Sequence, residues 1–461
     1  MRIQIFTSAL AFTLTFFSLT GISSGQSIFG GMEHSLVICN DQTVMAWGRN
    51  NFGQLGTGNN TNRNVPVQIT SLTDIKALNG GRYHSLALKN DGTVLAWGRN
   101  VNGALGNGNN TDSNVPVTVS SLSGIVAISG GEEYSMALKN DGTVWAWGKN
   151  NNGQLGIGTA TDSNTPVKVS GLTGITAIAA GNNHAMALHS DGTVWVWGWN
   201  AYGQLGTGNN TNRSEPGKIT TLSGISAIAA GSAHCLALKS DGTIWAWGYN
   251  STGELGIGNN SHRTVPSQVL DITTVKAIAA GNNFSIALKQ DGSVWTWGSN
   301  SDGQLGTGDN TAANKPGQVS NLSGITEIQG GWYHALAVNS EKKVWVWGDN
   351  GAGQLGNAST TDAKTPVQPQ GLCLTLTAQE MIRENRFLVY PNPAMDRVTI
   401  EHTNYEGLNT TFAVLNQTGQ VLFTGRIDAA KSTLDLGHLP AGLYILQIGE
   451  NERDTFKLLK Q

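Results

Sequence analysis

One unit of fifty residues occurs seven times along this sequence, and this repeat limits the possible fold more than any other feature. A Trp-Gly pair recurs every fifty residues, with no insertion or deletion, at Trp47, Trp97, Trp147, Trp197, Trp247, Trp297 and Trp347. An Asn three positions later, a Leu-Gly pair from Leu55 to Leu355 and a Pro from Pro66 to Pro366 repeat in step. Such a period indicates a repeat architecture in which each unit is one supersecondary element.

Each unit contains four short segments that are typical of β-strands. In the fourth copy they are residues 175–181, 184–189, 193–200 and 216–220, where small or apolar side chains alternate and Gly, Asn, Asp or Pro bound the segment. The pair Asp191-Gly192 suits the positive φ of a hairpin turn. One such sheet cannot bury both of its faces, so the copies must stack, and seven four-stranded sheets close readily into a ring. The sequence therefore predicts an all-β, seven-bladed β-propeller over residues 26–373.

The motifs within the repeat also resemble those of a known family. GGxxHS, DGTVWAWG and GQLGxG followed by a Pro are similar to the repeat of the regulator of chromosome condensation family, in every copy between residues 26 and 373. The resemblance implies a seven-bladed propeller, in agreement with the count. It also implies function, because founding eukaryotic members are guanine-nucleotide exchange factors and some secreted bacterial members bind a protein through one face.

The N-terminus has the pattern of a secretory signal peptide. Arg2 precedes an apolar run over residues 6–19, and the small residues Ser23, Ser24 and Gly25 follow, so residues 1–25 are expected to be removed after Gly25. No other stretch approaches the ~20 apolar residues that a membrane span requires. Charged residues make up 13% of the chain and the net charge is -3, which offers no basic surface for nucleic acid. A monomer outside the cytoplasm, without a membrane span or a nucleic-acid partner, is expected.

The chain changes character after Cys373. Residues 374–385 are interpreted as a linker, and residues 386–461 as a small C-terminal β-sandwich domain of short strands separated by turns. The elements YPNP at 390–393, LPAGLY at 439–444 and KLLKQ at 457–461 resemble the type A sorting domain of the type IX secretion system, although members usually have Asp where Asn416 stands. The resemblance implies contact with that secretion machinery and export through the outer membrane of a Gram-negative bacterium, to the cell surface or the medium. A generic adhesion-type sandwich is the alternative.

Two of the three cysteines are placed to close the ring. Cys39 ends the second strand of blade 1, and Cys373 lies where an eighth blade would begin, next to the start of blade 1 in a closed ring. First and second strands are antiparallel neighbours, so both cysteines are expected near one rim. We predict a disulfide there, and two unpaired thiols are the alternative. Cys235 occupies a position held by Ser or Ala in the other copies and is interpreted as a small buried residue.

The repeated polar motifs do not indicate catalysis or a cofactor. One repeat position holds histidine in five copies, and Tyr134 and Phe284 in the other two. Because Tyr and Phe could not replace imidazole at a metal site, a packed aromatic role is predicted for His34, His84, His184, His234 and His334. GQLGxG lacks the Lys-Ser or Lys-Thr of a phosphate-binding loop. We predict no catalytic residue, no cofactor and no metal ion. A secreted hydrolase with a site built from single loops is the alternative.

Variation among the copies is concentrated in two loops of each blade. Strands alternate in direction, so the loop between strands 1 and 2 and the loop between strands 3 and 4 emerge on one face. Of fourteen tryptophans, twelve occupy two repeat positions of strand 3, and Trp199 and Trp332 lie in these loops instead. Aromatic and Arg side chains are typical of binding faces, so the predicted partner-binding residues are Arg49, Phe52, Arg82, Tyr83, Trp199, Tyr202, Tyr249, Trp332 and Tyr333. Isolated surface aromatic residues without a role are the alternative.

These observations favour a secreted or cell-surface binding scaffold. Its loop face is expected to recognise a macromolecule, either an extracellular protein or a glycan. A regulator similar to the guanine-nucleotide exchange factors is the first alternative, but it fits poorly because the export signals place the chain outside the cell and no blade carries an inserted wedge. The secreted hydrolase is the second alternative.

Overall fold

A computed structural model describes residues 27–373, 387–402, 410–416, 420–449 and 454–460. The expected signal peptide and linker lie outside these residues. The chain divides into two compact units, Met1–Cys373 and Leu374–Gln461, and each is described by itself. Within the described residues, no helix is long and apolar enough to cross a membrane.

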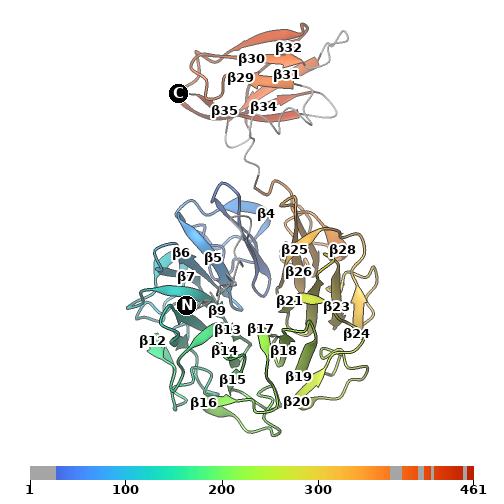
Figure 1. The fold of residues 1–461 in the computed structure, drawn as a ribbon. Coiled ribbons are helices and arrows are strands. Elements are labelled where there is room, and N and C mark those ends of the chain that lie inside the picture. The colour runs from blue at the N-terminus through green and yellow to red at the C-terminus, as the bar shows by residue number, and fades with distance from the viewer. Residues whose placement is uncertain (1–26, 374–386, 403–409, 417–419, 450–453, 461) are drawn as a thin grey trace, which may run out of the picture. The chain divides into compact units, whose positions relative to one another are not determined.

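Residues 27–373 form seven four-stranded antiparallel sheets arranged as the blades of a ring, as the sequence predicts (Figure 1). Blade 1 contains β1 to β4, and each later blade contains the next four strands. The first strands are Ser27–Gly30 (β1), Ile75–Gly80 (β5), Ile125–Gly130 (β9), Ile175–Ala180 (β13), Ile225–Ala230 (β17), Val275–Ala280 (β21) and Ile325–Gly330 (β25). The second strands are His34–Ile38 (β2), His84–Lys89 (β6), Tyr134–Lys139 (β10), His184–His189 (β14), His234–Lys239 (β18), Phe284–Lys289 (β22) and His334–Asn339 (β26).

The outer half of each blade consists of its third and fourth strands. The third strands are Val44–Gly48 (β3), Val94–Gly98 (β7), Val144–Gly148 (β11), Val194–Gly198 (β15), Ile244–Gly248 (β19), Val294–Gly298 (β23) and Val344–Gly348 (β27). The fourth strands are Arg63–Gln68 (β4), Ser113–Thr118 (β8), Ser163–Lys168 (β12), Arg213–Lys218 (β16), Arg263–Gln268 (β20), Ala313–Gln318 (β24) and Ala363–Val367 (β28). The prolines lie inside these fourth strands, which tolerate them because an edge strand leaves alternate N–H groups without a ladder partner.

Several strand boundaries in the fourth copy differ by one to three residues from those expected. The expected third strand reached residue 200, but β15 ends at Gly198, because Asn200 turns away to hold the next loop. The expected fourth strand began at Pro216, but β16 begins at Arg213 and pairs with Gly198 across an irregular register.

A tryptophan in each third strand joins its blade to the preceding one. The Trp97 indole Nε1 donates a hydrogen bond of 2.8 Å to the main-chain carbonyl of Gln54, and the other six copies form the same bond at 2.7 to 2.9 Å. All seven indoles are fully buried. Gly56 makes room for the indole, because a Cβ atom there would lie 2.8 Å from Trp97 Nε1, and its φ of +69° is unfavourable for other residues.

A second interblade contact uses the repeated histidines. His34 Nε2 lies 3.0 Å from Ser85 Oγ, and Ser85 Oγ donates to the same Gln54 carbonyl at 2.7 Å. Because the hydroxyl proton is used in that bond, His34 must carry its own proton on Nε2 and is neutral. The same contact occurs in four more pairs, namely His84 with Ser135, His184 with Cys235, His234 with Ser285 and His334 with Ser35.

Two blades lack this histidine contact, and in both of them the residues on the two sides of the contact have changed. Tyr134 and Phe284 replace histidine, and the residues that face them in the next blade are Ala185 and Ala335. The Tyr134 hydroxyl donates instead to the main-chain carbonyl of His184. The predicted packed aromatic role therefore holds for this repeat position, but the histidines also form specific interblade hydrogen bonds, which the sequence interpretation missed.

The ring closes without exchanging a strand between its ends. Each blade consists of four consecutive strands, so no strand from the C-terminal end completes blade 1. The interface between blades 7 and 1 has the standard contacts, including Trp47 Nε1 to Gln354 O at 2.7 Å. The predicted disulfide is present, joining Cys39 to Cys373 across a separation of 334 residues. Cys235 is a free, buried thiol.

The C-terminal unit contains two sheets, in agreement with the predicted small sandwich. One has the order β29 (Phe387–Tyr390), β30 (Arg397–His402), β33 (Lys431–Asp435). The other has the order β32 (Val421–Ile427), β31 (Thr410–Leu415), β34 (Gly442–Ile448), β35 (Asp454–Lys460). Their facing side chains form one buried core that includes Val398, Leu446 and Phe456.

The three sorting-like elements lie together in this unit. The Asn392 side chain donates to the Lys457 carbonyl at 2.6 Å and accepts from the Leu459 amide at 2.9 Å. The buried Lys460 ammonium donates to the carbonyls of Leu436 and Leu439, each at 2.7 Å, and pairs with Asp396 at 3.2 Å. The contacts of Asn392 and Lys460 thus hold the last strand, β35, against the rest of the sandwich.

The disulfide gives a first testable prediction. Replacing Cys39 and Cys373 by Ser should lower the free energy of unfolding by about 2 to 5 kcal/mol, because the unfolded chain regains the freedom of a very long loop. Chemical denaturation of oxidised protein measures this. Cys235→Ser is the matched control and should differ little, because Ser stands at the equivalent position in four other blades. Finding both Cys39 and Cys373 free by mass spectrometry of secreted protein would contradict the bridge.

The histidine pairs give a second prediction, on pH dependence. Burial, with a smaller contribution from His184, lowers the pKa of His234 to about 3. In the unfolded chain the pKa is about 6.5, so the stability that neutral His234 contributes is complete above that pH and is lost as the pH falls toward 3. His234→Phe with Ser285→Ala reproduces the Phe284–Ala335 pair and should lose about 1 kcal/mol less stability than the parent between pH 7.5 and 5.5. Urea denaturation at the two pH values gives this difference, and parallel losses in both proteins would refute it.

Candidate binding face

The two variable loops of each blade lie on one face of the propeller, as predicted, and contact each other. A chain of main-chain hydrogen bonds joins the first loops around the ring. The amides of Glu132, Asn182, Ser232 and Asn282 donate to the carbonyl at the equivalent position of the next blade at 2.9 to 3.3 Å, and the Trp332 amide donates to Gly31 at 3.0 Å. This face is therefore braced before any partner arrives, which lowers the ordering cost of binding.

Six loop side chains from blades 7, 1 and 2 form what we call the arginine–aromatic cluster, which consists of Phe52, Arg82, Tyr83, Arg99, Trp332 and Tyr333. The Arg82 guanidinium lies 4.9 Å from the centre of the Tyr83 ring and 5.3 Å from that of Trp332. Arg99 lies 5.2 Å from Phe52 and 5.6 Å from Tyr83. Cations and aromatic rings thus alternate along the cluster, an arrangement that cation–π attraction stabilises.

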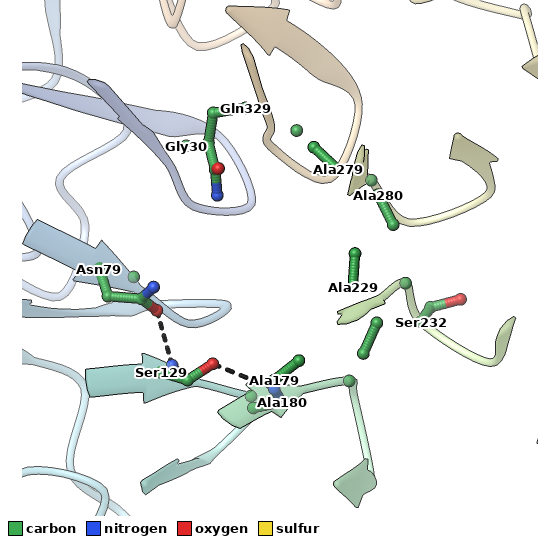
Figure 2. A pocket seen from close by; sticks show the side chains of 18 of the residues that line it. Gly30, Asn79, Ser129, Ala179, Ala180, Ala229, Ser232, Ala279, Ala280 and Gln329 are labelled. Carbon is green, nitrogen blue, oxygen red and sulfur yellow. Dashed lines mark hydrogen bonds between the residues drawn. The ribbon is translucent and has the colours of Figure 1, made fainter. Parts of the chain in front are cut away.

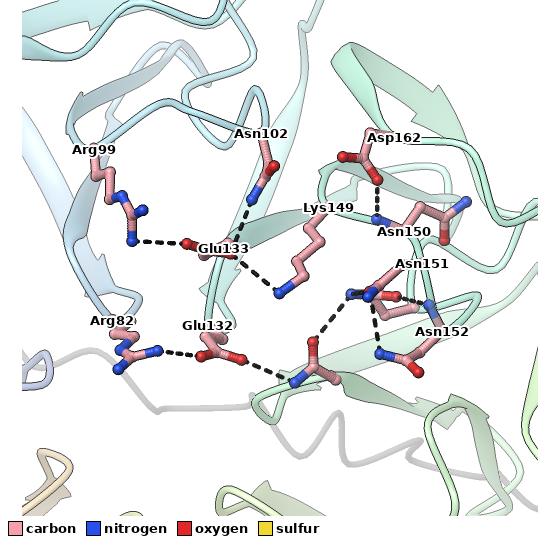
Figure 3. A network of polar contacts seen from close by, with 12 residues as sticks. Arg82, Arg99, Asn102, Glu132, Glu133, Lys149, Asn150, Asn151, Asn152 and Asp162 are labelled. Carbon is pink, nitrogen blue, oxygen red and sulfur yellow. Dashed lines mark hydrogen bonds and ion pairs between the residues drawn. The ribbon is translucent and has the colours of Figure 1, made fainter.

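Two carboxylates form ion pairs with Arg82, Arg99 and the neighbouring Lys149 (Figure 3). Glu132 pairs with Arg82, and Glu133 pairs with Arg99 at 2.9 Å and Lys149 at 3.1 Å. The carboxylate side chains are 14 to 15% exposed and the three cations 24 to 31%, so the cluster presents mainly its positive and aromatic groups to solvent. Arg49 pairs with Glu33 in the same way beside this cluster, and burial raises the pKa of Glu33 although Arg49 opposes the rise.

Four rings of blades 4 and 5 form a second group, the neutral aromatic cluster, which consists of Trp199, Tyr202, Tyr249 and His262. Tyr202 lies at its centre, with ring centres 5.4 Å from Trp199, 4.9 Å from Tyr249 and 5.1 Å from His262. Tyr249 and His262 are stacked at 4.9 Å. His262 is exposed and the other three rings are half-buried.

The structure therefore brings together eight of the nine predicted partner-binding residues in two clusters, with Arg49 beside the first. These rings contact one another and are therefore not isolated, and their role in binding stays a prediction. Arg99 and His262 were outside the predicted set. His262 could have been found, because Asn or Asp stands at its repeat position in five of the other six copies. Arg99 has no such signal, since cations also stand at its position in neighbouring blades.

A cavity of about 240 Å³ lies on the ring axis, lined by the first strands (Figure 2). Its wall contains Gly, Ala, Ser, Asn and Gln together with Phe29, Trp332 and four isoleucines. The Asn79 and Ser129 side chains bridge adjacent blades by accepting from the amides of Gly130 and Ala180. The lining residues include no carboxylate, imidazole, thiol or amine. The lining therefore provides no side-chain acid or base, and the expectation that this protein is not an enzyme stays a prediction.

Comparisons with protein-family models and with solved structures identify this architecture. The described strands define a seven-bladed propeller followed by a β-sandwich. A model of the RCC1-like domain matches residues 116–383, and models of the regulator of chromosome condensation (RCC1) repeat match residues 26–54, 41–88, 75–104 and 91–138. The chain belongs to the RCC1-like family. A model of the secretion system C-terminal sorting domain matches residues 388–460, which points to export by type IX secretion and to a secreted or cell-surface location.

Solved structures support the same fold. Human WBSCR16 is 23% identical with a TM-score of 0.64, over 71% of this chain and 93% of the human one. Prp20p of Saccharomyces cerevisiae, studied for its binding to Gsp1p and histones, is 24% identical with a TM-score of 0.65, over 75% of this chain and 87% of the yeast one. A structure of yeast RCC1 (Prp20) bound to Kap60 is 22% identical with a TM-score of 0.65, over 83% of this chain and 93% of that one. These likenesses concern the fold.

Proposed function

We propose that this protein is a secreted or cell-surface scaffold that binds another protein, with the arginine–aromatic cluster as its anchor. The observation that carries the proposal is the alternation of Trp332, Arg82, Tyr83, Arg99 and Phe52 across three blades. Trp, Tyr and Arg are the residues that most often dominate the energy of protein interfaces. The sorting domain supports a partner outside the cell.

The charges of this cluster indicate the chemistry of the partner surface. The three cations are more exposed than the carboxylates that hold them, so carboxylates of a partner can approach the guanidinium edges while its apolar groups cover the rings. Glu132 and Glu133 keep the cations ordered before binding, so the partner need not pay for that order. We therefore expect a partner surface with acidic residues around an apolar centre.

Loop substitutions taken from other blades test this proposal. Trp332→Asn and Arg82→Asn introduce the residue of positions 182 and 282, so the main-chain bonds of the loop can persist. Each should weaken binding of a captured protein by roughly thirtyfold and change the free energy of unfolding by less than about 0.5 kcal/mol. Trp147→Ala removes a fully buried indole that joins two blades, so it should instead cost about 3 to 5 kcal/mol of stability.

Partners can be captured with the mature chain from the proteins of its native surroundings, and affinities measured by biolayer interferometry. If Trp332→Asn and Arg82→Asn bind every captured protein like the parent, this cluster is not the anchor.

Export gives a further prediction. Removing residues 386–461 leaves a propeller that retains both seam cysteines, because Cys373 precedes the second unit. In a host with type IX secretion this shortened protein should accumulate, folded, in the periplasm. Fractionation followed by immunoblotting measures its location, with the full chain as control. Normal amounts of the shortened protein in the medium would show that the C-terminal unit is not needed for sorting.

A further inference from the structure

The neutral aromatic cluster differs from the arginine–aromatic cluster in its charge. Residues 199–212 and 249–262, the loops that carry it, contain a single carboxylate, Glu254, and no Lys or Arg. Glu254 is fully buried and accepts bonds from the Thr252 amide and hydroxyl, so it does not reach the surface. Apart from the buried Gln204, Leu205 and Leu255 and the half-buried Ile257, the rest of both loops consists of Asn, Ser, Thr, Ala and Gly.

The two tyrosine hydroxyls of this cluster are unused. Within the part of the chain that the structure describes, neither Tyr202 nor Tyr249 has a hydrogen-bond partner for its hydroxyl. Tyr134 and Tyr444, by contrast, donate to main-chain carbonyls. Half-buried tyrosines that keep their hydroxyls unpaired can donate to or accept from a bound molecule.

A buried donor beneath these loops is also left without a partner. Gln204 is fully buried, and its Oε1 accepts from the Tyr202 amide, but its Nε2 has no acceptor. In blade 3 the equivalent Gln154 Nε2 donates to Asn183, and in blade 7 Gln354 Nε2 donates to Asp349, whereas Gln54 Nε2 in blade 1 lacks an acceptor as Gln204 Nε2 does. The residues at those two positions around Gln204 are Ala233 and Trp199, neither of which can accept.

Hydrogen bonds to the main chain hold the loops that carry the four rings. The amides of Trp199 and Tyr249 donate to the carbonyls of Asn183 and Ala233 at 2.8 and 2.9 Å. His262 Nδ1 accepts from the Asn250 amide at 2.9 Å, so the imidazole closes its own loop while its ring stacks on Tyr249. The rings are therefore fixed by bonds that a ligand does not need to break.

From these observations we propose that the neutral aromatic cluster binds an uncharged glycan. One face of a pyranose ring exposes C–H groups, which pack on the negative face of an aromatic ring, while its hydroxyls need neutral donors and acceptors. Aromatic rings, unpaired phenol hydroxyls and surrounding amides supply both, and no exposed cation is present in these loops to select an acidic ligand. This inference gives a ligand class to part of the proposed binding face and rests on that proposal only in using the same face.

Oligosaccharide titrations test it. The mature chain is titrated by isothermal calorimetry with cellohexaose, laminarihexaose, maltohexaose, xylohexaose and mannohexaose, with hexagalacturonate as the charged comparator. We expect at least one neutral sugar to bind with a dissociation constant below about 1 mM, and more tightly than hexagalacturonate. If none of the neutral sugars binds, or if hexagalacturonate binds best, the inference is wrong.

Substitutions from another blade localise the site. Trp199→Ser and Tyr249→Ser introduce the residue that stands at position 299, so the loops should fold normally, which melting curves can verify. Each should weaken sugar binding at least about tenfold, whereas Trp332→Asn, in the other cluster, should not. Unchanged sugar affinity in both Ser variants would overturn the assignment.

The two proposals can fail separately. If Trp199→Ser and Tyr249→Ser release a captured protein but leave sugar binding intact, this cluster is a protein site and the glycan inference falls while the scaffold proposal stands. If Trp332→Asn and Arg82→Asn retain every captured protein while Trp199→Ser loses sugar binding, the protein anchor is wrong and the glycan site stands.

Discussion

The hydrogen bond from each strand-3 indole to a main-chain carbonyl of the preceding blade sets the geometry of the propeller. It occurs at all seven interfaces, including the one between blades 7 and 1, within a range of 2.7 to 2.9 Å. A buried indole N–H without an acceptor would cost about 1 to 3 kcal/mol, so each blade can approach its neighbour in only one position. Seven identical interfaces close the ring without a shared strand, and the Cys39–Cys373 bridge adds a covalent link at the seam.

The acceptor is a carbonyl and not a side chain, which leaves the loop above it free to vary. Gln occupies this position in five blades, but Ala104 and Glu254 serve equally because only their carbonyls are used. Each serine or cysteine that contacts a histidine uses the same carbonyl, so one main-chain atom receives two interblade bonds in five interfaces. Recognition residues can then change a few positions away, as at Trp199 and Arg99, without altering a blade interface.

The sequence was sufficient for the features that depend on the repeat. Strand count, blade count and the seam disulfide follow from spacing, because identical units must stack identically. The partners of single side chains did not follow. The change from His–Ser to Phe284–Ala335 is visible in the sequence, yet its meaning requires the knowledge that position 284 of one blade faces position 335 of the next. Glu132 and Glu133 likewise pair with arginines of the preceding blade, and which loop side chains of neighbouring blades meet was visible only in the structure.

The same reasoning separates the two clusters on the loop face. Both arise where a single blade departs from its siblings, and the structure shows which departures are neighbours. Arg82, Arg99 and the neighbouring Lys149 come with Glu132 and Glu133, so two carboxylates offset two of the three positive charges. Trp199, Tyr202, Tyr249 and His262 lie in loops without Lys or Arg, and the hydroxyls of the two tyrosines are unpaired within the described residues. A propeller that tolerates loop variation at every blade can thus carry two surfaces of different chemistry on separate blades of one face, each determined by substitutions in two or three blades.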